Sequence, residues 1–111
     1  MNSGPDIVIS KAAIVDAARR LIGGQIGVIE ASRLISAELH DVDPEMHDQE
    51  LLGFLGIDSQ TDHLAVGAML EEWHPSAREA KRLEVEDFER SFRDEALKAA
   101  VVLIQRYGAR A

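Results

Sequence analysis

The chain has 111 residues, no cysteine and a formal net charge of −8. This length fits one domain, residues 1–111, with its own hydrophobic core, and the lack of cysteine excludes disulfides, thiolate metal sites and a thiol nucleophile. The negative charge argues against nucleic acid as a partner, because binding to phosphates depends on Lys and Arg.

No apolar run approaches the roughly 20 residues that a membrane helix needs. Residues 1–10 also lack the basic and apolar regions of a secretory signal. We therefore expect a cytoplasmic protein that does not bind a membrane.

The first predicted helix covers residues 11–22. Ser10 is a suitable N-cap residue, and Gly23 with Gly24 provides a stop signal. Residues 1–9 are expected to be a flexible N-terminus. The apolar stripe of this helix has helical spacing and consists of Ile14, Ala18, Leu21 and Ile22.

A second helix is predicted over residues 26–40, with Glu30, Arg33 and Glu38 facing water. Gly27 near its start would allow close packing against the first helix. Pro44 ends the segment, because the residue before a proline disfavours helical backbone. The expected buried stripe is Val28, Ala31, Ile35 and Leu39.

The middle of the chain is harder to assign from its sequence. Asp43 followed by Pro44 is typical of a helix start, which predicts a short helix through residues 46–52. Residues 53–67 fit two structures equally well. One is a short β-hairpin with a turn at residues 58–62, and the other is a helix end followed by a second helix from Ser59 or Thr61.

The clearest element is a long C-terminal helix over residues 77–107, followed by Gly108 as a stop. Its apolar residues recur every three or four positions and include Phe88 and Phe92, which should be buried. A break near residues 83–85 remains compatible with the pattern. Acid-first i,i+4 ion pairs are expected on the exposed face: Glu86–Arg90, Glu89–Arg93 and Asp94–Lys98. The predicted fold is a mainly α small helical bundle with an irregular middle segment.

Negative charge is concentrated in residues 41–74, which contain nine carboxylates and no Lys or Arg. A folded acidic surface speeds association with a basic protein by electrostatic steering. Trp73 could anchor such an interface or lie in the core. The predicted partner-binding residues are Asp41, Asp43, Glu45, Asp48, Glu50, Asp58, Asp62, Glu71, Glu72 and Trp73.

Patterns typical of metal binding are not met. A calcium loop that starts at Asp41 would have Met46 and Leu52 where glycine and glutamate are required. The four histidines lack His-x-x-His spacing, although Asp43, His47 and Asp62 could converge on a metal. We expect no metal and no cofactor.

Ser59, His63 and the carboxylates Asp58 and Asp62 provide the residue types of a hydrolase triad. However, the chain has no nucleophile elbow of the Gly-x-Ser-x-Gly type, and turn capping explains Ser59 and Thr61 far better. The prediction is therefore a protein without catalytic residues. A small enzyme using Asp58, Asp62 and His63 is the rival interpretation.

Ile57-Asp58-Ser59-Gln60-Thr61-Asp62, followed by Val66-Gly67 and Trp73, resembles a family of small, functionally uncharacterised bacterial proteins with an Ile-Asp-Ser-x-Thr-Asp motif before a C-terminal helix. The resemblance covers about residues 25–107. It departs at Ala65, where the family commonly has proline. Small acidic proteins of this type are often immunity proteins of toxin–immunity pairs, including contact-dependent growth inhibition systems.

The resemblance implies a cognate toxin as partner and transfers no catalytic residue. We expect an immunity protein that covers the active site of a basic toxin, for example a nuclease domain, with its acidic face. The expected apolar centre of that face is drawn from Leu51, Phe54, Leu64 and Trp73. A homo-oligomeric scaffold, joined through the long helix, is a further alternative.

Overall fold

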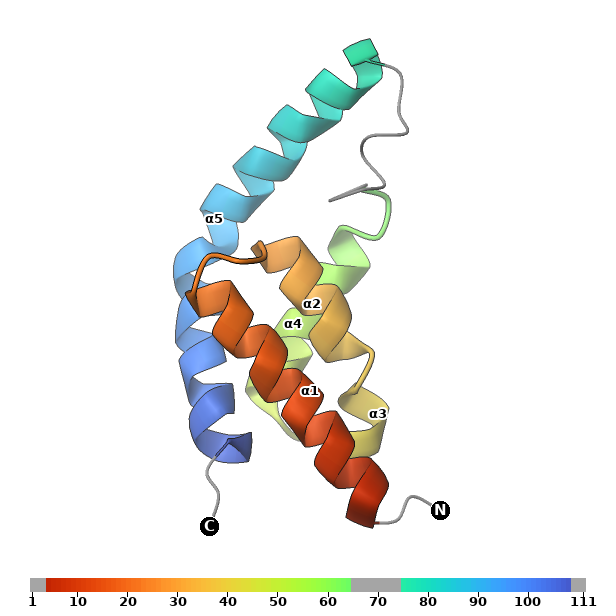
Figure 1. Ribbon diagram of the computed structural model, residues 1–111. Helices are drawn as coiled ribbons and strands as arrows, with labels where there is room; N and C mark the ends of the chain where they lie inside the picture. The colour runs from red at the N-terminus through yellow and green to blue at the C-terminus, as the bar shows by residue number, and fades with distance from the viewer. Residues whose placement is uncertain (1–3, 65–74, 109–111) are drawn as a thin grey trace.

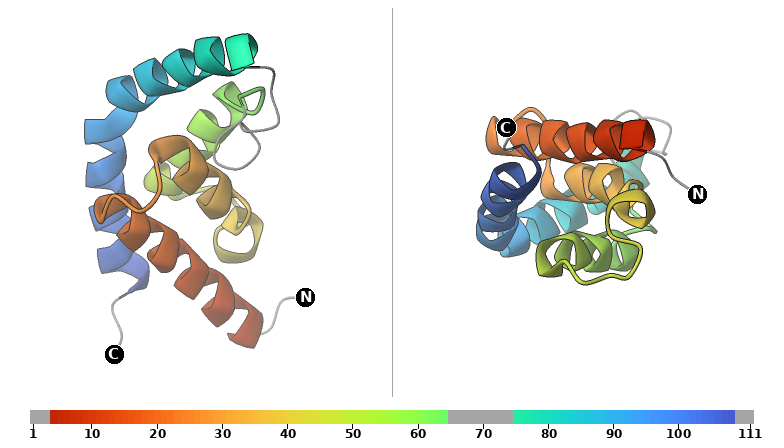
Figure 2. Two further views of the ribbon diagram at one scale, coloured as in Figure 1. Left: turned by 45° about the horizontal axis from the view of Figure 1, so that its top comes forward. Right: turned by 90° about the horizontal axis from the view of Figure 1, so that it is seen from below.

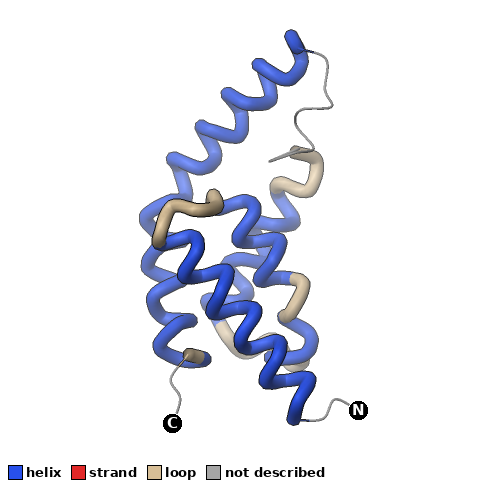
Figure 3. Tube along the Cα trace, in the orientation of Figure 1, coloured by secondary structure: helices blue, strands red, loops and turns tan. Residues whose placement is uncertain are grey.

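Five helices make up the secondary structure in the computed structural model, which describes residues 4–64 and 75–108. Within these ranges there is no strand (Figure 3), and no helix is long and apolar enough to cross a bilayer. The predicted mainly α bundle is confirmed. The helices are α1 (Gly4–Ile22), α2 (Val28–Ser36), α3 (Leu39–Val42), α4 (Gln49–Gln60) and α5 (Pro75–Tyr107).

The C-terminal half of α5 lies along one side of the bundle (Figure 1). Helix α1 packs along this half, α2 lies between α1 and α4, and the N-terminal half of α5 extends past the other helices. Seen from another side, α5 curves around the bundle (Figure 2). The largest fully buried apolar side chains are Phe54, Ile14, Leu21, Ile29, Ile35, Leu51, Leu103 and Val28.

Helix α1 begins at Gly4, seven residues before the predicted start. Ser10 is therefore not an N-cap. It is buried inside the helix, where its hydroxyl donates a hydrogen bond to Asp41 of α3 at 3.1 Å. Residues 4–9, expected to be flexible, belong to the helix, and residues 1–3 lie outside the described residues. Ile14, Ala18 and Leu21 are buried as predicted, whereas Ile22 is 43% exposed.

The predicted second helix is divided in two, because α2 ends at Ser36 and the four-residue α3 begins at Leu39. The buried stripe itself is confirmed across both helices. Its four members, Val28, Ala31, Ile35 and Leu39, all belong to the core.

Helix α4 resolves the ambiguity of the middle segment for the described residues. Residues 53–60 continue the helix, so the hairpin is wrong there, and residues 65–67 lie outside the described residues. The helix starts at Gln49 with Asp48 as its N-cap, not after Asp43. The Asp43 carboxylate instead accepts hydrogen bonds from the backbone N–H groups of His47 and Asp48 and orders the preceding loop.

The long helix is confirmed as α5, which runs for 33 residues without a break. Burial along it is uneven. Leu103 is fully buried, whereas Leu83 is 51% exposed. Phe88 and Phe92 are only partly buried and stack on each other with ring centroids 4.5 Å apart. Burial declines toward the N-terminal half because that half extends beyond α1, α2 and α4.

The expected ion pairs along α5 are replaced by others. Glu86 pairs with Arg82, which also binds Glu79, and Arg90 pairs with Asp87. The carboxylate of Glu89 instead reaches α2, where it accepts hydrogen bonds from the first two backbone N–H groups of that helix. Helix spacing limits which pairs can form, but rotamers and neighbouring helices decide which of them do.

Candidate functional site

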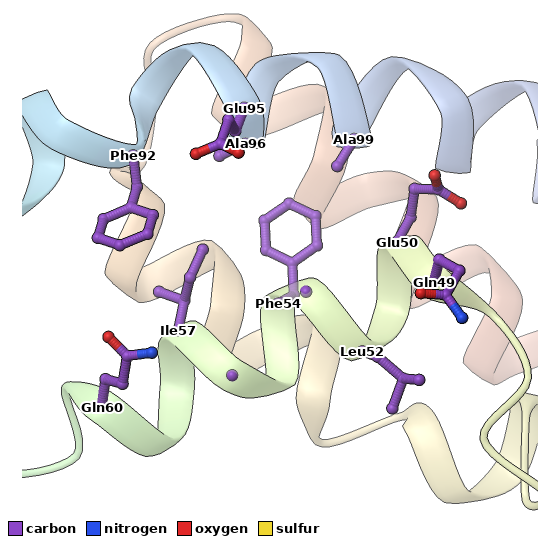
Figure 4. A pocket seen from close by; sticks show the side chains of 12 residues that line it. Gln49, Glu50, Leu52, Phe54, Ile57, Gln60, Phe92, Glu95, Ala96 and Ala99 are labelled. Atoms are coloured by element: carbon purple, nitrogen blue, oxygen red, sulfur yellow. The ribbon is translucent and has the colours of Figure 1, made fainter.

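An apolar groove of about 320 Å³ lies between α4 and α5. Phe54 and Ile57 point from α4 toward α5, and Phe92 points from α5 toward α4 (Figure 4). Phe54 is almost fully buried at the base, whereas Phe92 remains partly exposed. The groove therefore combines an aromatic floor with access from outside.

Small residues line both walls of this groove. Gly53 and Gly56 contribute from α4, and Ala96 and Ala99 contribute from α5. A Cβ atom added to either glycine would meet no atom of the described residues within 4 Å. The space is thus left open by missing side chains on α4.

The rim of the groove is polar. Its polar side chains are Gln49, Glu50 and Gln60 from α4 and Glu95 from α5, and no Lys or Arg is among the described residues that line it. Glu95 is exposed on the α5 side. An occupant would therefore meet an apolar floor and an acidic, amide-rich edge.

The open space leads to a stability prediction. Gly53→Ala or Gly56→Ala should each raise the free energy of unfolding by roughly 0.5–1 kcal/mol, because alanine is the better helix former and its methyl group enters empty space. Urea unfolding followed by circular dichroism measures the change. A loss of stability in both variants would mean that the groove does not have room for a methyl group.

A charged cluster joins the start of α4 to the end of α5 beside the groove. One Asp48 oxygen, Oδ1, accepts hydrogen bonds from the N–H groups of Glu50 and Leu51 at 3.0 and 3.1 Å. The other, Oδ2, accepts from the Tyr107 hydroxyl at 2.6 Å and lies 2.6 Å from Nη1 of Arg106. Arg106 also donates to Glu50 at 2.9 Å. Asp48 is thus both a helix cap and an inter-helix contact.

This cluster shifts the pKa values of Asp48, Tyr107 and Arg106, and the hydrogen bonds to Asp48 and Glu50 raise that of Arg106. Burial by itself would raise the pKa of Asp48, but hydrogen bonds from Tyr107, Arg106 and the Leu51 N–H outweigh it and lower the pKa below its ordinary value. Burial, and next the hydrogen bond to Asp48, raises the pKa of Tyr107 above its ordinary value. The native contact therefore requires an ionised Asp48 and a protonated Tyr107.

A second basic residue, Arg33 of α2, binds the end of α4. Its Nη2 donates to the carbonyl oxygens of Thr61 and Leu64 at 2.6 and 2.5 Å, and its Nε lies 3.9 Å from Asp58. Arginine at a helix C-terminus satisfies carbonyl groups that have no helical partner. Arg33 was expected to face water, and it instead connects two helices.

The predicted acidic face is divided by these contacts. Among its carboxylates, Asp41 accepts from Ser10, Asp43 orders a loop, Asp48 and Glu50 bind Arg106, and Asp58 lies near Arg33. Glu45 and Asp62 are exposed. Glu71, Glu72 and Trp73 lie outside the described residues. Residues 41–74 contain no Lys or Arg, and the arginines that pair with their carboxylates come from α2 and α5.

The expected apolar centre of the partner face is wrong for three of its four residues. Leu51, Phe54 and Leu64 are 0%, 1% and 4% exposed, so they belong to the core and cannot form a surface. The fourth, Trp73, lies outside the described residues. Periodicity identifies these residues as apolar, but cannot separate a core contact from an interface.

The candidate hydrolase residues contact different partners. Asp58 lies beside Arg33 of α2, and His63 lies 3.4 Å from Glu84 of α5. Thr61 is buried and donates to the carbonyl of Ile57, as local capping predicts. In the part of the chain that the structure describes, no three His, Cys, Asp or Glu residues gather in a metal-binding arrangement.

Sequence reasoning missed the groove and the cap on α2. The signals were present but indirect. Gly53 and Gly56 are spaced on one face of a helix, and Gly27 precedes a helix without a capping side chain of its own. Comparisons of the chain with protein-family models, curated proteins and solved structures find no match. Evidence about function therefore comes from the groove and from the charges around it.

Proposed function

We propose that this protein is a protein-binding inhibitor of the immunity type, which acts in the cytoplasm by binding a cognate basic toxin domain stoichiometrically. The binding surface is the face formed by α4 and α5, and binding covers the active site of the toxin. The toxin as partner follows from the family resemblance. The basic character of the partner follows from charge.

The observation that supports this proposal is an open apolar groove whose rim carries carboxylates and amides, with no Lys or Arg among the described residues that line it. Protein interfaces combine an apolar centre with a polar rim. Acidic residues at such a rim favour partners rich in Lys and Arg and exclude acidic ones. The groove thus provides the apolar centre that the buried Leu51 and Phe54 cannot.

Three exposed carboxylates lie on these helices or next to them in the chain. Glu45 precedes α4, Asp62 follows it, and Glu95 lies on α5 at the groove. They differ from Asp48 and Asp58, which contact arginines inside the fold. The charges of Glu45, Asp62 and Glu95 can steer a basic partner, and these three residues are not part of the Asp48–Arg106–Tyr107 cluster.

Reversing these three charges together, as Glu45→Lys, Asp62→Lys and Glu95→Lys, should lower the association rate with the toxin encoded by the neighbouring gene by about tenfold or more at low salt. The effect should shrink in high salt, since the Debye length falls from roughly 8 Å at 0.15 M to about 3 Å at 1 M. Stopped-flow or surface plasmon resonance measurements give the rates.

A control with the same change in net charge reverses three exposed carboxylates of α1 and of the N-terminal half of α5: Asp16→Lys, Glu86→Lys and Asp87→Lys. This variant changes net charge equally but should slow association much less. Equal rates for the two triple variants would contradict the proposed location of the interface. If the wild-type protein did not bind the toxin encoded by the neighbouring gene, that result would contradict the proposed function itself.

A further inference from the structure

We infer that the α4–α5 groove receives one large apolar side chain of the partner, carried on a segment with an adjacent Lys or Arg. Gly53 and Gly56 are then the residues that determine specificity, because they keep the groove open. This inference rests on the proposed function and identifies the chemistry of the partner at the same site.

The two glycines are not explained by folding. Each lies inside α4, where glycine is less stabilising than alanine. Other glycines in the chain have an internal reason. Gly24 has a positive φ of 77°, and a Cβ on Gly27 would come within 2.7 Å of the Glu89 carboxylate. At Gly53 and Gly56 the added Cβ would meet no atom of the described residues within 4 Å, so no contact within the described fold requires glycine there.

The size and lining of the groove fit a side chain. Its volume of about 320 Å³ is at the lower end of the range for small-molecule sites, roughly 300–1,000 Å³. The partly exposed Phe92 supplies an aromatic surface on which another ring or a branched aliphatic group can pack, above the buried Phe54. Ala96 and Ala99 keep the opposite wall low.

The charges at the rim select the neighbour of that side chain. Glu95 is exposed at one wall, and Glu50 stands at the other while it binds Arg106. Because Glu50 is already paired with Arg106, a cation next to the inserted group would gain mainly from Glu95, which would also repel an anion. The groove therefore favours an apolar group with a positive charge beside it.

Two small probes test this selection directly. 2-Phenylethylammonium and 3-phenylpropionate both carry a phenyl ring on a short chain, but have opposite charges. In ¹⁵N-correlated NMR titrations, the ammonium probe should shift the amide signals of Gly53 and Gly56 and bind at least about tenfold more tightly than the carboxylate. Equal binding of both probes, or shifts that avoid α4 and α5, would overturn the inference.

Filling the groove supplies the second arm. Gly56→Leu should weaken the ammonium probe and the cognate toxin by at least about tenfold, whereas Gly56→Ala should retain most of the binding of both. Ser59→Leu is the matched control, because Ser59 is exposed on the same helix but does not line the groove. Circular dichroism establishes that each variant is folded before binding is measured.

The outcomes separate this inference from the proposed function. If the charge reversals weakened toxin binding but Gly56→Leu did not, the insertion of a partner side chain into the groove would be contradicted. The proposed inhibitor function would remain supported. Absence of any toxin binding would remove the function, while the probe titrations would still decide whether the groove selects a cationic apolar group.

Two other occupants would also overturn the inference. One is a second copy of the chain, which sedimentation would reveal as a wild-type dimer that Gly56→Leu converts to a monomer. The other is the chain's own Trp73, the single tryptophan. A shift of its fluorescence in Gly56→Leu, without probe or partner, would place it at the groove.

Discussion

Asp48→Ala should lower the free energy of unfolding by about 3 kcal/mol. The change removes an N-cap, which costs roughly 0.5–2 kcal/mol, together with a charged contact to Tyr107 and Arg106. The Asp48 side chain is only 6% exposed, but Arg106 is 41% exposed, so its lost ion pair costs less than a fully buried one. For a domain of this size the melting temperature should fall by roughly 10 °C or more.

Asp48→Asn separates the cap from the charge, since asparagine is also a good N-cap. It should lose less stability than Asp48→Ala. The pKa of Asp48 is lowered in the folded protein, so its ionised form stabilises the fold above the unfolded pKa of about 3.9. The stability difference between wild type and Asp48→Asn should shrink as the pH falls through the folded pKa. A difference that stays constant from pH 7 to pH 2 would show that the charge of Asp48 does not matter.

Glu89→Ala should lower the free energy of unfolding by about 2–3 kcal/mol. The Glu89 carboxylate accepts hydrogen bonds from the N–H groups of Val28 and Ile29 at 2.6 and 3.0 Å. Both residues are fully buried, and a buried donor left without a partner costs roughly 1–3 kcal/mol. The carboxylate also opposes the positive end of the α2 dipole. Urea unfolding of the variant, with exposed Asp87→Ala as a control, measures the loss.

A double-mutant cycle with Gly27 tests the reason for that glycine. A Cβ at Gly27 would come within 2.7–2.9 Å of the Glu89 carboxylate oxygens and displace them from the N–H groups. The backbone of Gly27 is extended, with φ at −89°, so alanine fits its conformation. Gly27→Ala should therefore destabilise the wild type but have little effect in the Glu89→Ala background. Equal losses in the two backgrounds would refute this coupling.

Local patterns predicted much of the helical structure. The stripe of Val28, Ala31, Ile35 and Leu39 identified a buried face because helical periodicity is a property of neighbouring residues. The same reasoning found α5 and its end at Gly108. It missed the start of α1, because a serine before an apolar stripe is typical of an N-cap. The hydroxyl of Ser10 instead binds Asp41, which lies 31 residues away in the chain and could not be identified from local spacing.

The candidate site was predictable only in outline. The concentration of acids in residues 41–74 follows from composition alone, but which of them remain exposed does not. Asp48 and Asp58 contact Arg106 and Arg33 only after the helices pack. Of the predicted residues, Glu45 and Asp62 are exposed in the structure. The prediction did not include Glu95 of α5, which packing brings to the groove.

By itself the sequence determined an acidic chain of amphipathic helices, because composition, spacing and stop residues act within a few positions of one another. The tertiary structure alone decided the cap that Glu89 provides, 61 residues from Val28. It also decided the contact of Asp48 with Tyr107 and the groove at Gly53 and Gly56. These features depend on distances between residues far apart in the chain, and such distances are set by packing of the core.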